Sequence, residues 1–232
     1  TGKSTLSNLI AGFLTPSAGE IKFAGKNLLR LSVKQRAEKI GYILQDPNQM
    51  ISQTKIFDEV ASGLRLRQVA ETEIKAQVGK ILKICGLYQM RNWPISALSF
   101  GQKKRVTIAS ILVLAPQMLI LDEPTAGQDL YHYTEIINFL EKLQRQHNLT
   151  IVLITHDIHL MLEYTQRTLV LNNGALLADD SPAAILTNDK IIQKSSLART
   201  SLFDLAEHFC LPSATDFVSK FIQTERQARI SD

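Results

Sequence analysis

The sequence predicts an α/β fold built around a mostly parallel sheet. The apolar residues at 118–121 form an unbroken run, which is typical of a parallel strand that is buried on both faces. A second apolar strand is predicted at 151–154, and apolar residues recur at helical spacing over 136–143 between the two. Strands that alternate with helices in this way build a parallel sheet that is covered by helices.

The chain opens on the end of a phosphate-binding sequence. Residues 1–5 read Thr-Gly-Lys-Ser-Thr, which matches the second half of a P-loop. In such a loop the backbone N–H groups surround phosphate oxygens, Lys3 reaches the β- and γ-phosphates, and Ser4 offers its hydroxyl to Mg²⁺. Apolar residues at helical spacing over 6–13 place this loop at a helix N-terminus, whose dipole favours anions. Because the first glycine of the pattern would precede Thr1, we expect a fragment that binds ATP poorly by itself.

The next segments predict a small β portion and then helices. A turn cluster at 15–19 precedes residues 20–24, whose alternation is typical of a strand. From residue 56 to about 86 the apolar residues form a stripe at helical spacing. After Pro182 the pattern breaks into shorter amphipathic pieces, whose apolar residues either cover the core or form part of a dimer interface. These residues are Leu202, Leu205, Phe209, Phe217, Val218 and Phe221.

Gln45 is a candidate metal ligand that lies between a predicted strand and a turn. It follows the apolar stretch 40–44 and opens a turn, Asp46-Pro47-Asn48. A neutral amide can bind Mg²⁺, or a water on it, and then release it. Taken alone, a glutamine before a turn is a solvated loop residue. The neighbouring motifs favour the metal-binding interpretation.

Two carboxylates, Asp122 and Glu123, end the apolar run at 118–121. Because ligands of doubly wound sheets bind beyond the carboxyl ends of the strands, these acids lie where a nucleotide and its metal would bind. One acid can hold Mg²⁺ and the other can position a water. The alternative is a chain that simply leaves the core, and the P-loop sequence argues against it. His156 follows the second apolar strand in a corresponding place.

Five elements occur in the order found in ATP-binding cassette (ABC) ATPases, which the chain resembles over nearly its whole length. They are Gly2-Lys3-Ser4, Gln45, 98–102, 119–123 and His156. The resemblance implies the P-loop NTPase fold of ABC ATPases, an α/β fold with a RecA-like core, a small antiparallel β portion and a helical subdomain at about 50–115. It also implies an ABC ATPase domain at 1–194 and a C-terminal helical extension at 195–232.

The resemblance assigns catalytic and metal-binding roles. Glu123 is the carboxylate that polarises the attacking water, and His156 contacts that water and the γ-phosphate. Gln45 belongs to the Q-loop, which reports on the γ-phosphate. Ser4, Gln45 and Asp122 are the residues that hold Mg²⁺, with Asp122 acting through coordinated waters.

The resemblance also assigns the contacts to ATP, of which the P-loop contributes Gly2, Lys3, Ser4 and Thr5. Ser99, Gly101 and Gln102 resemble the signature motif, which binds the γ-phosphate of ATP held by the opposite subunit. Phe100 stands where the best-known version of this motif has glycine. Asp129 falls at the acidic position of the D-loop, which connects the two ATP sites of a dimer. The basic run 103–105 either supports anion binding or forms a solvated first helical turn.

Residues 45–49, 99–105 and 126–129 are most similar to the ATPases of energy-coupling-factor (ECF) importers. Such complexes pair two ATPase domains, as a homodimer, a heterodimer or a tandem fusion, with a transmembrane coupling protein and a small membrane protein that captures the substrate. Residues 98–165 resemble the second cassette of tandem ATPases for hydroxymethylpyrimidine/thiamine uptake, and cobalt or another micronutrient is the alternative substrate. The resemblance implies a peripheral bacterial subunit on the cytoplasmic face of the cell membrane, with a docking groove near 45–50.

Two other classes of protein are alternatives. A soluble ABC ATPase of DNA repair or the ribosome tends to carry a long coiled-coil insertion or a basic linker, and the sequence shows neither. A non-hydrolysing interaction module would explain the incomplete P-loop. The presence of Asp122, Glu123 and His156 argues for an enzyme instead.

The composition agrees with a globular subunit that has no nucleic-acid partner. Hydrophobic residues make up 45% and charged residues 21% of the 232 residues, enough to bury a sizeable core. A net charge of +4 is too mild to predict binding to nucleic acid. The two cysteines predict no disulfide framework. No apolar run approaches the roughly 18 residues of a membrane span, so we expect any action at a membrane to go through partners.

Overall fold

The computed structural model describes residues 2–126, 130–195 and 197–231. Contacts divide the chain into two compact units, of which the first is 4–154. The second is 155–232, and the first three residues of the chain are grouped with it. The predicted domain boundary at residue 194 lies inside the second unit and stays a prediction.

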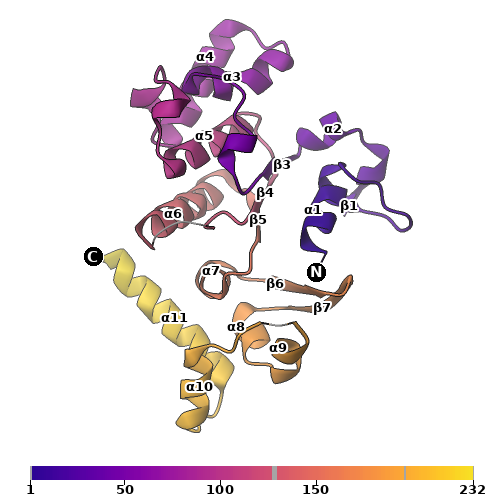
Figure 1. The fold of residues 1–232 in the computed structure, drawn as a ribbon, viewed down its shortest axis with the longest axis vertical. Helices are drawn as coiled ribbons and strands as arrows, with labels where there is room; N and C mark the ends of the chain where they lie inside the picture. Colours follow the sequence, from indigo (N-terminus) through magenta and orange to yellow (C-terminus); the bar gives the residue numbers. More distant parts are fainter. Residues whose placement is uncertain (1, 127–129, 196, 232) are drawn as a thin grey trace. The chain divides into compact units, whose positions relative to one another are not determined.

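A parallel sheet forms the core of the first unit (Figure 1). Its strands are β3 (Ile40–Ile43), β4 (Met118–Asp122) and β5 (Thr150–Ile154), in the order β3-β4-β5, and both pairings are parallel. In the central strand, Leu119, Ile120 and Leu121 are buried. The prediction of a parallel strand that is buried on both faces at 118–121 is therefore confirmed.

Helices make both connections of this sheet. Between β3 and β4 the chain forms α3 (Ile56–Leu66), α4 (Glu71–Ile84) and α5 (Phe100–Leu112), and α3 contacts both of the others. The helical stripe predicted from 56 to 86 is thus two helices, because the chain turns at 67–70. Between β4 and β5 lies α6 (Leu130–His147), whose apolar residues at 136–143 include the buried Ile136, Ile137, Leu140 and Leu143. Short 3₁₀ helices are η1 (Leu28–Arg30), η2 (Pro47–Gln49), η3 (Tyr88–Met90) and η4 (Ile95–Ala97).

The beginning of the chain forms the helix that the sequence predicts, α1 (Lys3–Ala11). Its apolar stripe is buried only in part, because Ile10 packs against the core while Leu6 is exposed. The fully buried residues of the helix are Ser7 and Ala11, one helical turn apart. Buried Arg36 donates from Nη1 to the Leu9 carbonyl at 2.8 Å and so caps the helix C-terminus, where cations are favoured.

The small β portion that the sequence predicts follows this helix. It is an antiparallel pair, β1 (Lys22–Phe23) and β2 (Lys26–Asn27). The next helix, α2 (Val33–Ala37), carries Arg36. The side chain that caps the C-terminus of α1 therefore comes from α2, a later helix of the same unit.

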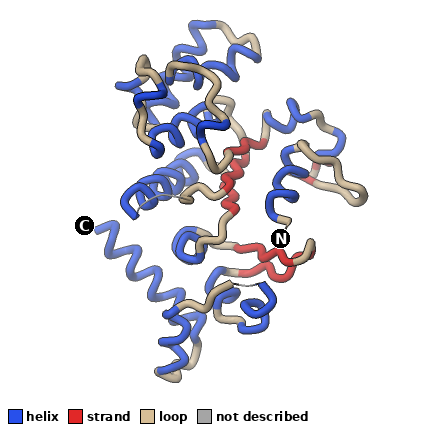
Figure 2. The backbone as a smooth tube through the Cα atoms, in the orientation of Figure 1, coloured by secondary structure: helices blue, strands red, loops and turns tan. Residues whose placement is uncertain are grey.

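The second unit consists of an antiparallel hairpin and helices (Figure 2). The hairpin is β6 (Thr168–Asn172) and β7 (Ala175–Asp180), joined by Asn173 and Gly174, which both have positive φ, as hairpin turns of two residues require. The helices are α7 (Ile158–Tyr164), α8 (Pro182–Leu186), α9 (Asp189–Ser195), α10 (Ser201–His208) and α11 (Ala214–Ser231). None of the helices in the described part of the chain is long and apolar enough to cross a bilayer.

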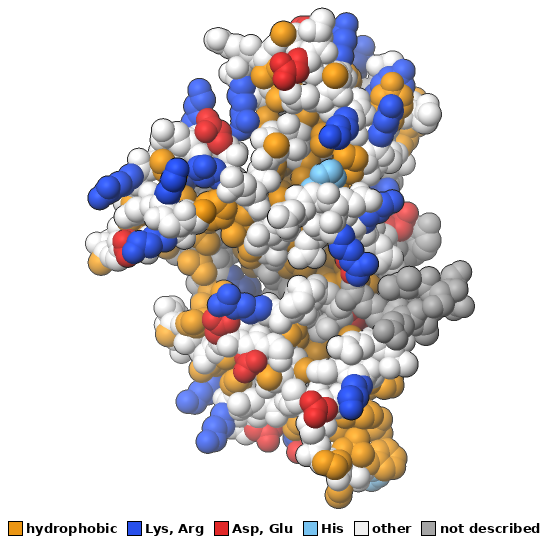
Figure 3. All heavy atoms as spheres, turned by 180° about the vertical axis from the view of Figure 1, so that it is seen from behind, with side chains coloured by type: hydrophobic (Ala, Val, Ile, Leu, Met, Phe, Trp, Pro, Cys, Tyr) orange, Lys and Arg blue, Asp and Glu red, His pale blue; other side chains and the backbone are white. Residues whose placement is uncertain are grey.

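The apolar residues after Pro182 divide between a core and a surface. Ala183, Val218 and Ile222 form a buried cluster against which Leu202 and Phe217 pack, so part of the C-terminal segment does cover a core. Figure 3 shows hydrophobic side chains on the surface in its lower part. Among the described residues after Pro182, the large hydrophobic side chains that are exposed are Leu205, Phe209, Leu211 and Phe221.

A glycine in β3 gives a test of the sheet packing. A Cβ at Gly41 would lie 2.2 Å from Ile111 Cγ2 and 2.9 Å from Leu119 Cδ1. We predict that Gly41→Ala lowers the free energy of unfolding by about 1–3 kcal/mol, because the side chains from α5 and β4 must move. The control is Gly79→Ala within α4, where the nearest atom, Tyr88 Cε2, is 3.6 Å away. Gly79→Ala should raise the free energy of unfolding by roughly 0.5–1 kcal/mol, because glycine is unfavourable inside a helix. Urea unfolding measures the free energy of both variants, and equal effects of the two substitutions would contradict the packing of β3.

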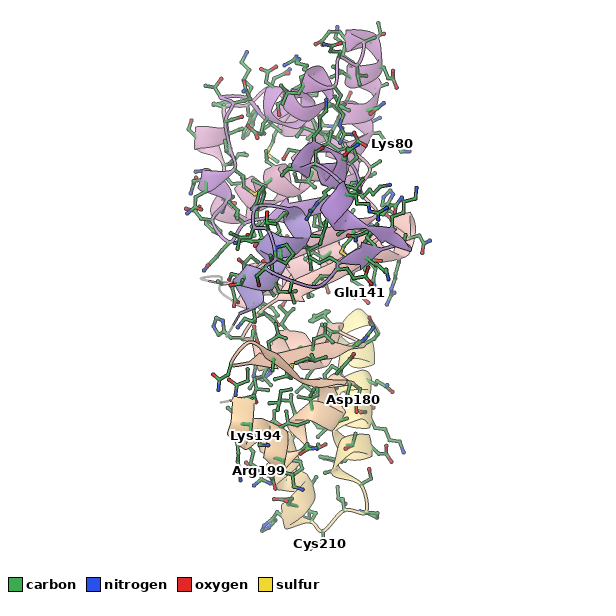
Figure 4. All side chains as sticks on the ribbon, turned by 90° about the vertical axis from the view of Figure 1, so that its right-hand side faces the viewer. Lys80, Glu141, Asp180, Lys194, Arg199 and Cys210 are labelled. Carbon is green, nitrogen blue, oxygen red and sulfur yellow. The ribbon has the colours of Figure 1, made fainter. Side chains whose placement is uncertain are left out.

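The two cysteines should differ in reactivity. Cys85 is fully buried at the end of α4, and burial raises the pKa of its thiol to about 12, although the Arg105 cation acts in the opposite direction. Cys210 is exposed in the turn between α10 and α11 (Figure 4). Because the thiolate is the reactive form, we predict that a maleimide labels Cys210 alone in the native protein and both cysteines in denaturant. Peptide mass spectrometry locates the label, and rapid native labelling of Cys85 would contradict its burial.

Candidate functional site

The carboxyl ends of β3 and β4 bring three of the predicted site residues to one edge of the sheet. Ile43 pairs with Leu121 in the parallel register. Gln45 follows β3 by two residues, while Asp122 is the last residue of β4 and Glu123 comes next. Parallel strands end at a common edge, which is where α/β sheets bind ligands.

Hydrogen bonds tie the first turn of α1 to this edge. Ser7 Oγ donates to the Ser4 carbonyl at 2.9 Å and lies 3.0 Å from the hydroxyl of Tyr42 in β3. Tyr42 in turn donates to Asp122 Oδ2 at 3.4 Å. Burial, together with the Asp122 carboxylate, raises the pKa of Tyr42, so the phenol keeps the proton that it donates. Ser4 and Asp122 are thereby held at the same edge by two side chains that the motif pattern does not include.

The donor atoms at this edge suit a hard divalent cation. Ser4 offers a hydroxyl, Gln45 an amide oxygen and Asp122 a carboxylate. Ser4 and Gln45 are exposed and Asp122 is half-buried, so solvent can reach the first two. Mg²⁺ prefers oxygen ligands and keeps several waters, binding through one or two carboxylates and substrate phosphates. The residue types present therefore fit Mg²⁺ held together with a nucleotide.

Glu123 has an unusual backbone conformation. Its φ is 43°, in the left-handed region that residues with a side chain rarely adopt. The conformation is held from both sides, because the Glu123 N–H donates to the Ile154 carbonyl at 2.8 Å and the Glu123 carbonyl accepts from Ala126 N at 3.2 Å. Strain of this kind costs about 1–3 kcal/mol and concentrates at functional sites. The side chain is half-buried.

The loop that carries Gln45 is ordered by its own side chains. Asp46 Oδ1 accepts from Asn48 N at 2.9 Å and from Asn48 Nδ2 at 2.8 Å, which starts η2 at the buried Pro47. Leu44 N lies 3.3 Å from the sulfur of Met50, which closes the loop on β3. The Gln45 side chain is left exposed at the end of the strand.

Ser99 begins α5 with a capping box. Ser99 Oγ accepts from Gln102 N at 3.3 Å, and Gln102 Oε1 accepts from Ser99 N at 3.0 Å. Gly101 lies in the first turn between them and is half-buried. Phe100 is 41% exposed, so the aromatic ring that replaces the usual glycine extends outward from the helix. The three predicted signature residues therefore stand together at one helix N-terminus.

The basic run 103–105 is not a uniformly solvated turn. Lys104 is 1% exposed and donates to the Gln45 carbonyl at 2.6 Å, so the prediction of a solvated helical turn is wrong for this residue. Support of anion binding by the run stays a prediction. Burial lowers its pKa to about 8, against the attraction of the Asp46 and Asp122 carboxylates. Helical spacing is the signal that would have found it, because Lys104 is four residues before Ile108, which is fully buried.

The remaining predicted site residues are Gly2, Lys3, Thr5, His156 and Asp129. Gly2 is exposed, with φ of 95°, Lys3 is the first residue of α1, and Thr5 is exposed on the same helix. His156 belongs to the second unit, where it is exposed and precedes Asp157, the N-cap of α7. Asp129 lies outside the described residues.

A family model described as ABC transporter matches residues 1–126, which is more than half of the chain. The chain belongs to the ABC transporter ATP-binding family. The β3-β4-β5 sheet, the small antiparallel pair and the helices α3–α5 agree with the ABC ATPase fold. The ABC resemblance drawn from the motifs is therefore confirmed, and so is the predicted fold.

Curated relatives of this ABC domain are longer proteins. One, from Lactiplantibacillus plantarum, is named as an ABC transporter ATP-binding protein and is 66% identical over 229 residues, covering 99% of this chain and 40% of that protein. Another with the same name, from Enterococcus faecalis, is 59% identical over 228 residues, covering 98% and 40%. The chain thus spans about two fifths of their length.

A solved structure is similar to this chain in both fold and sequence. It is cbiO1 from Clostridium perfringens, described as part of the ABC transporter complex cbiONQ. The TM-score is 0.76 at 35% sequence identity, and the match covers 89% of this chain and 83% of cbiO1. The agreement at this identity supports the same fold for this chain.

The cap of α5 has a matched counterpart that allows a stability test. Ser32 begins α2 with the same capping box, made with Gln35 instead of Gln102. We predict that Ser99→Ala and Ser32→Ala each lower the free energy of unfolding by about 0.5–2 kcal/mol, because each leaves an N–H group at a helix N-terminus without its cap. Urea unfolding measures both changes. No loss in Ser99→Ala would contradict the capping geometry of α5.

Proposed function

We propose that this chain binds ATP with Mg²⁺ at the edge formed by β3 and β4 and hydrolyses it. The link from Ser4 through Ser7 and Tyr42 to Asp122 carries the proposal, because it joins the phosphate-binding helix to the carboxylate at the strand end. Ser4, Gln45 and Asp122 would hold Mg²⁺, which supplies charge neutralisation at the phosphates when bound.

Each residue at the edge has a chemical task in this proposal. Gly2, Lys3, Ser4 and Thr5 bind the phosphates, with Lys3 at the β- and γ-phosphates. Glu123 accepts a hydrogen bond from the water that attacks the γ-phosphate and orients it in line with the leaving group. His156 contacts the same water and the γ-phosphate. Two main-chain hydrogen bonds fix the backbone of Glu123 at the end of β4, from which its side chain extends.

The second half of each ATP site comes from another ABC domain, as a homodimer, a heterodimer or a tandem fusion. Ser99 Oγ accepts from its own helix, so its hydroxyl hydrogen can be donated to a phosphate oxygen. Gly101 and Gln102 add first-turn N–H groups and the dipole of α5. Asp129 would connect the two sites at the domain interface.

The chain is proposed to drive an importer of the ECF type. The similarity of 45–49 and 99–105 to such ATPases supports this, as does the likeness to cbiO1, which is part of a transporter complex. The partners would be a transmembrane coupling protein and a membrane protein that captures the substrate, with this chain at the cytoplasmic face of the membrane. Hydroxymethylpyrimidine/thiamine and cobalt remain the proposed substrates, and the capture protein determines which is transported.

The catalytic assignment is tested by Glu123→Gln in the full-length protein that carries this chain. The amide keeps the size of the side chain but is a much weaker base. We predict a loss of about 100- to 10,000-fold in kcat with ATP affinity retained, together with a stable ATP-bound dimer. Phosphate release and size-exclusion chromatography measure the two effects.

The signature assignment uses the matched serines. At a temperature where both variants are folded, Ser99→Ala should lower the rate of ATP hydrolysis, whereas Ser32→Ala should leave it unchanged. For the catalytic assignment, undiminished turnover in Glu123→Gln would remove Glu123 from its role. Equal rates in the two serine variants would remove Ser99 from the ATP site. Absence of hydrolysis by the unaltered full-length protein would favour a non-hydrolysing interaction module.

A further inference from the structure

Lys104 is a buried lysine that contacts the main chain of a proposed Mg²⁺ ligand. Its Nζ donates to the Gln45 carbonyl at 2.6 Å and to the Leu44 carbonyl at 3.5 Å, where β3 has ended. Its side chain is 1% exposed. Lysine is almost never fully buried unless its ammonium is paired, so this contact replaces the hydration that the ammonium loses.

The charges around this ammonium come from both strand ends. Asp46, in the loop after β3, and Asp122, at the end of β4, attract it, and the ring of Phe100 lies 6.0 Å from Nζ. An apolar side chain of similar volume would fill this space without the cost of burying a charge. The lysine instead supplies a donor to the Gln45 carbonyl, which fixes the position of the main chain there.

Two neighbouring contacts fasten the same segment. Lys103 Nζ donates to Asn48 Oδ1 at 3.1 Å. Buried Glu59 in α3 accepts at Oε2 from Ser52 N at 2.8 Å and from Gln53 N at 2.7 Å. Residues 45–53 are thus attached at three points to α3 and α5, and Lys104 makes the attachment closest to the strand end.

We propose that Lys104 is a positioning residue, which fixes the main chain at Gln45 to the helix that begins after Ser99. This role rests on the proposed ATPase function. By holding the carbonyl, Lys104 sets where the Gln45 amide leaves the end of β3, and it makes Gln45 and Ser99 parts of one rigid body. Gln45 serves the ATP site of its own domain and Ser99 the site of the partner domain, so Lys104 would align the two.

The test compares Lys104→Met with Lys80→Met in the full-length protein. Methionine is unbranched and of similar length but has no donor, and Lys80 is an exposed residue on α4 (Figure 4). We expect Lys104→Met to lower kcat by at least about tenfold, because a misplacement of about 1 Å can cost about 100-fold. The Mg²⁺ concentration for half-maximal rate should rise, while KM for ATP changes less than about twofold because the P-loop is intact.

Rescue by a charged donor distinguishes positioning from a merely structural role. Lys104→Met leaves the Gln45 carbonyl without its buried donor, so its unfolding midpoint should fall, and rates are compared at a temperature where both variants are folded. Lys104→Arg, which keeps a charged donor, should recover most of the rate. Lys80→Met should match the wild type throughout. A kcat for Lys104→Met within about twofold of the wild type would overturn the proposal.

Hydrogen exchange gives a second measurement that needs no activity. In Lys104→Met the amides of 44–53 should exchange faster while those of α5 keep their protection. Unchanged exchange at 44–53, or equal loss of protection in the loop and α5, would overturn the positioning role. If the wild type hydrolyses no ATP, the proposed function fails, and the exchange result alone then decides whether Lys104 holds the Gln45 segment.

Discussion

The parallel pairing of β4 with a strand on each side is the constraint on which the rest of the first unit depends. Because of this pairing, residues 119–121 are buried on both faces of the sheet, and the carboxyl ends of all three strands lie at one edge. Asp122 and Glu123 stand at that edge because β4 ends there. The bond from Glu123 N to the Ile154 carbonyl extends the pairing with β5 by one residue and holds the left-handed backbone. Without β5 beside it, that conformation would lose one of the two hydrogen bonds that hold it.

Polar side chains that are buried or half-buried then fix the elements around the edge. Arg36 caps α1, Tyr42 joins α1 to Asp122, and Lys104 joins α5 to the Gln45 main chain. Each of these groups would be costly to bury without a partner, and each has one in a different element. Such contacts are satisfied in only one arrangement of the elements. They therefore specify the relative positions of the candidate site residues more sharply than apolar packing does.

Ser99 shows how one residue can serve both the fold and the proposed function. Its hydroxyl oxygen accepts from Gln102 N and starts α5, and the same helix end presents N–H groups and a positive dipole. The identical box at Ser32 starts α2. A capping box alone is therefore no mark of a phosphate site, and the ABC assignment depends on the order of the motifs and on the family match.

The sequence by itself determined the fold class, the ABC family and the order of the motifs, because apolar periodicity and short loop motifs are local properties of the chain. The strand at 118–121 and the helix over 136–143 were predictable for this reason. The face that α1 buries was not, since its Ser7 is buried by contacts from β3, far along the chain. Only the tertiary structure decided that Lys104 is buried and that Tyr42 joins Ser4 to Asp122, because those contacts join residues 35 to 80 positions apart.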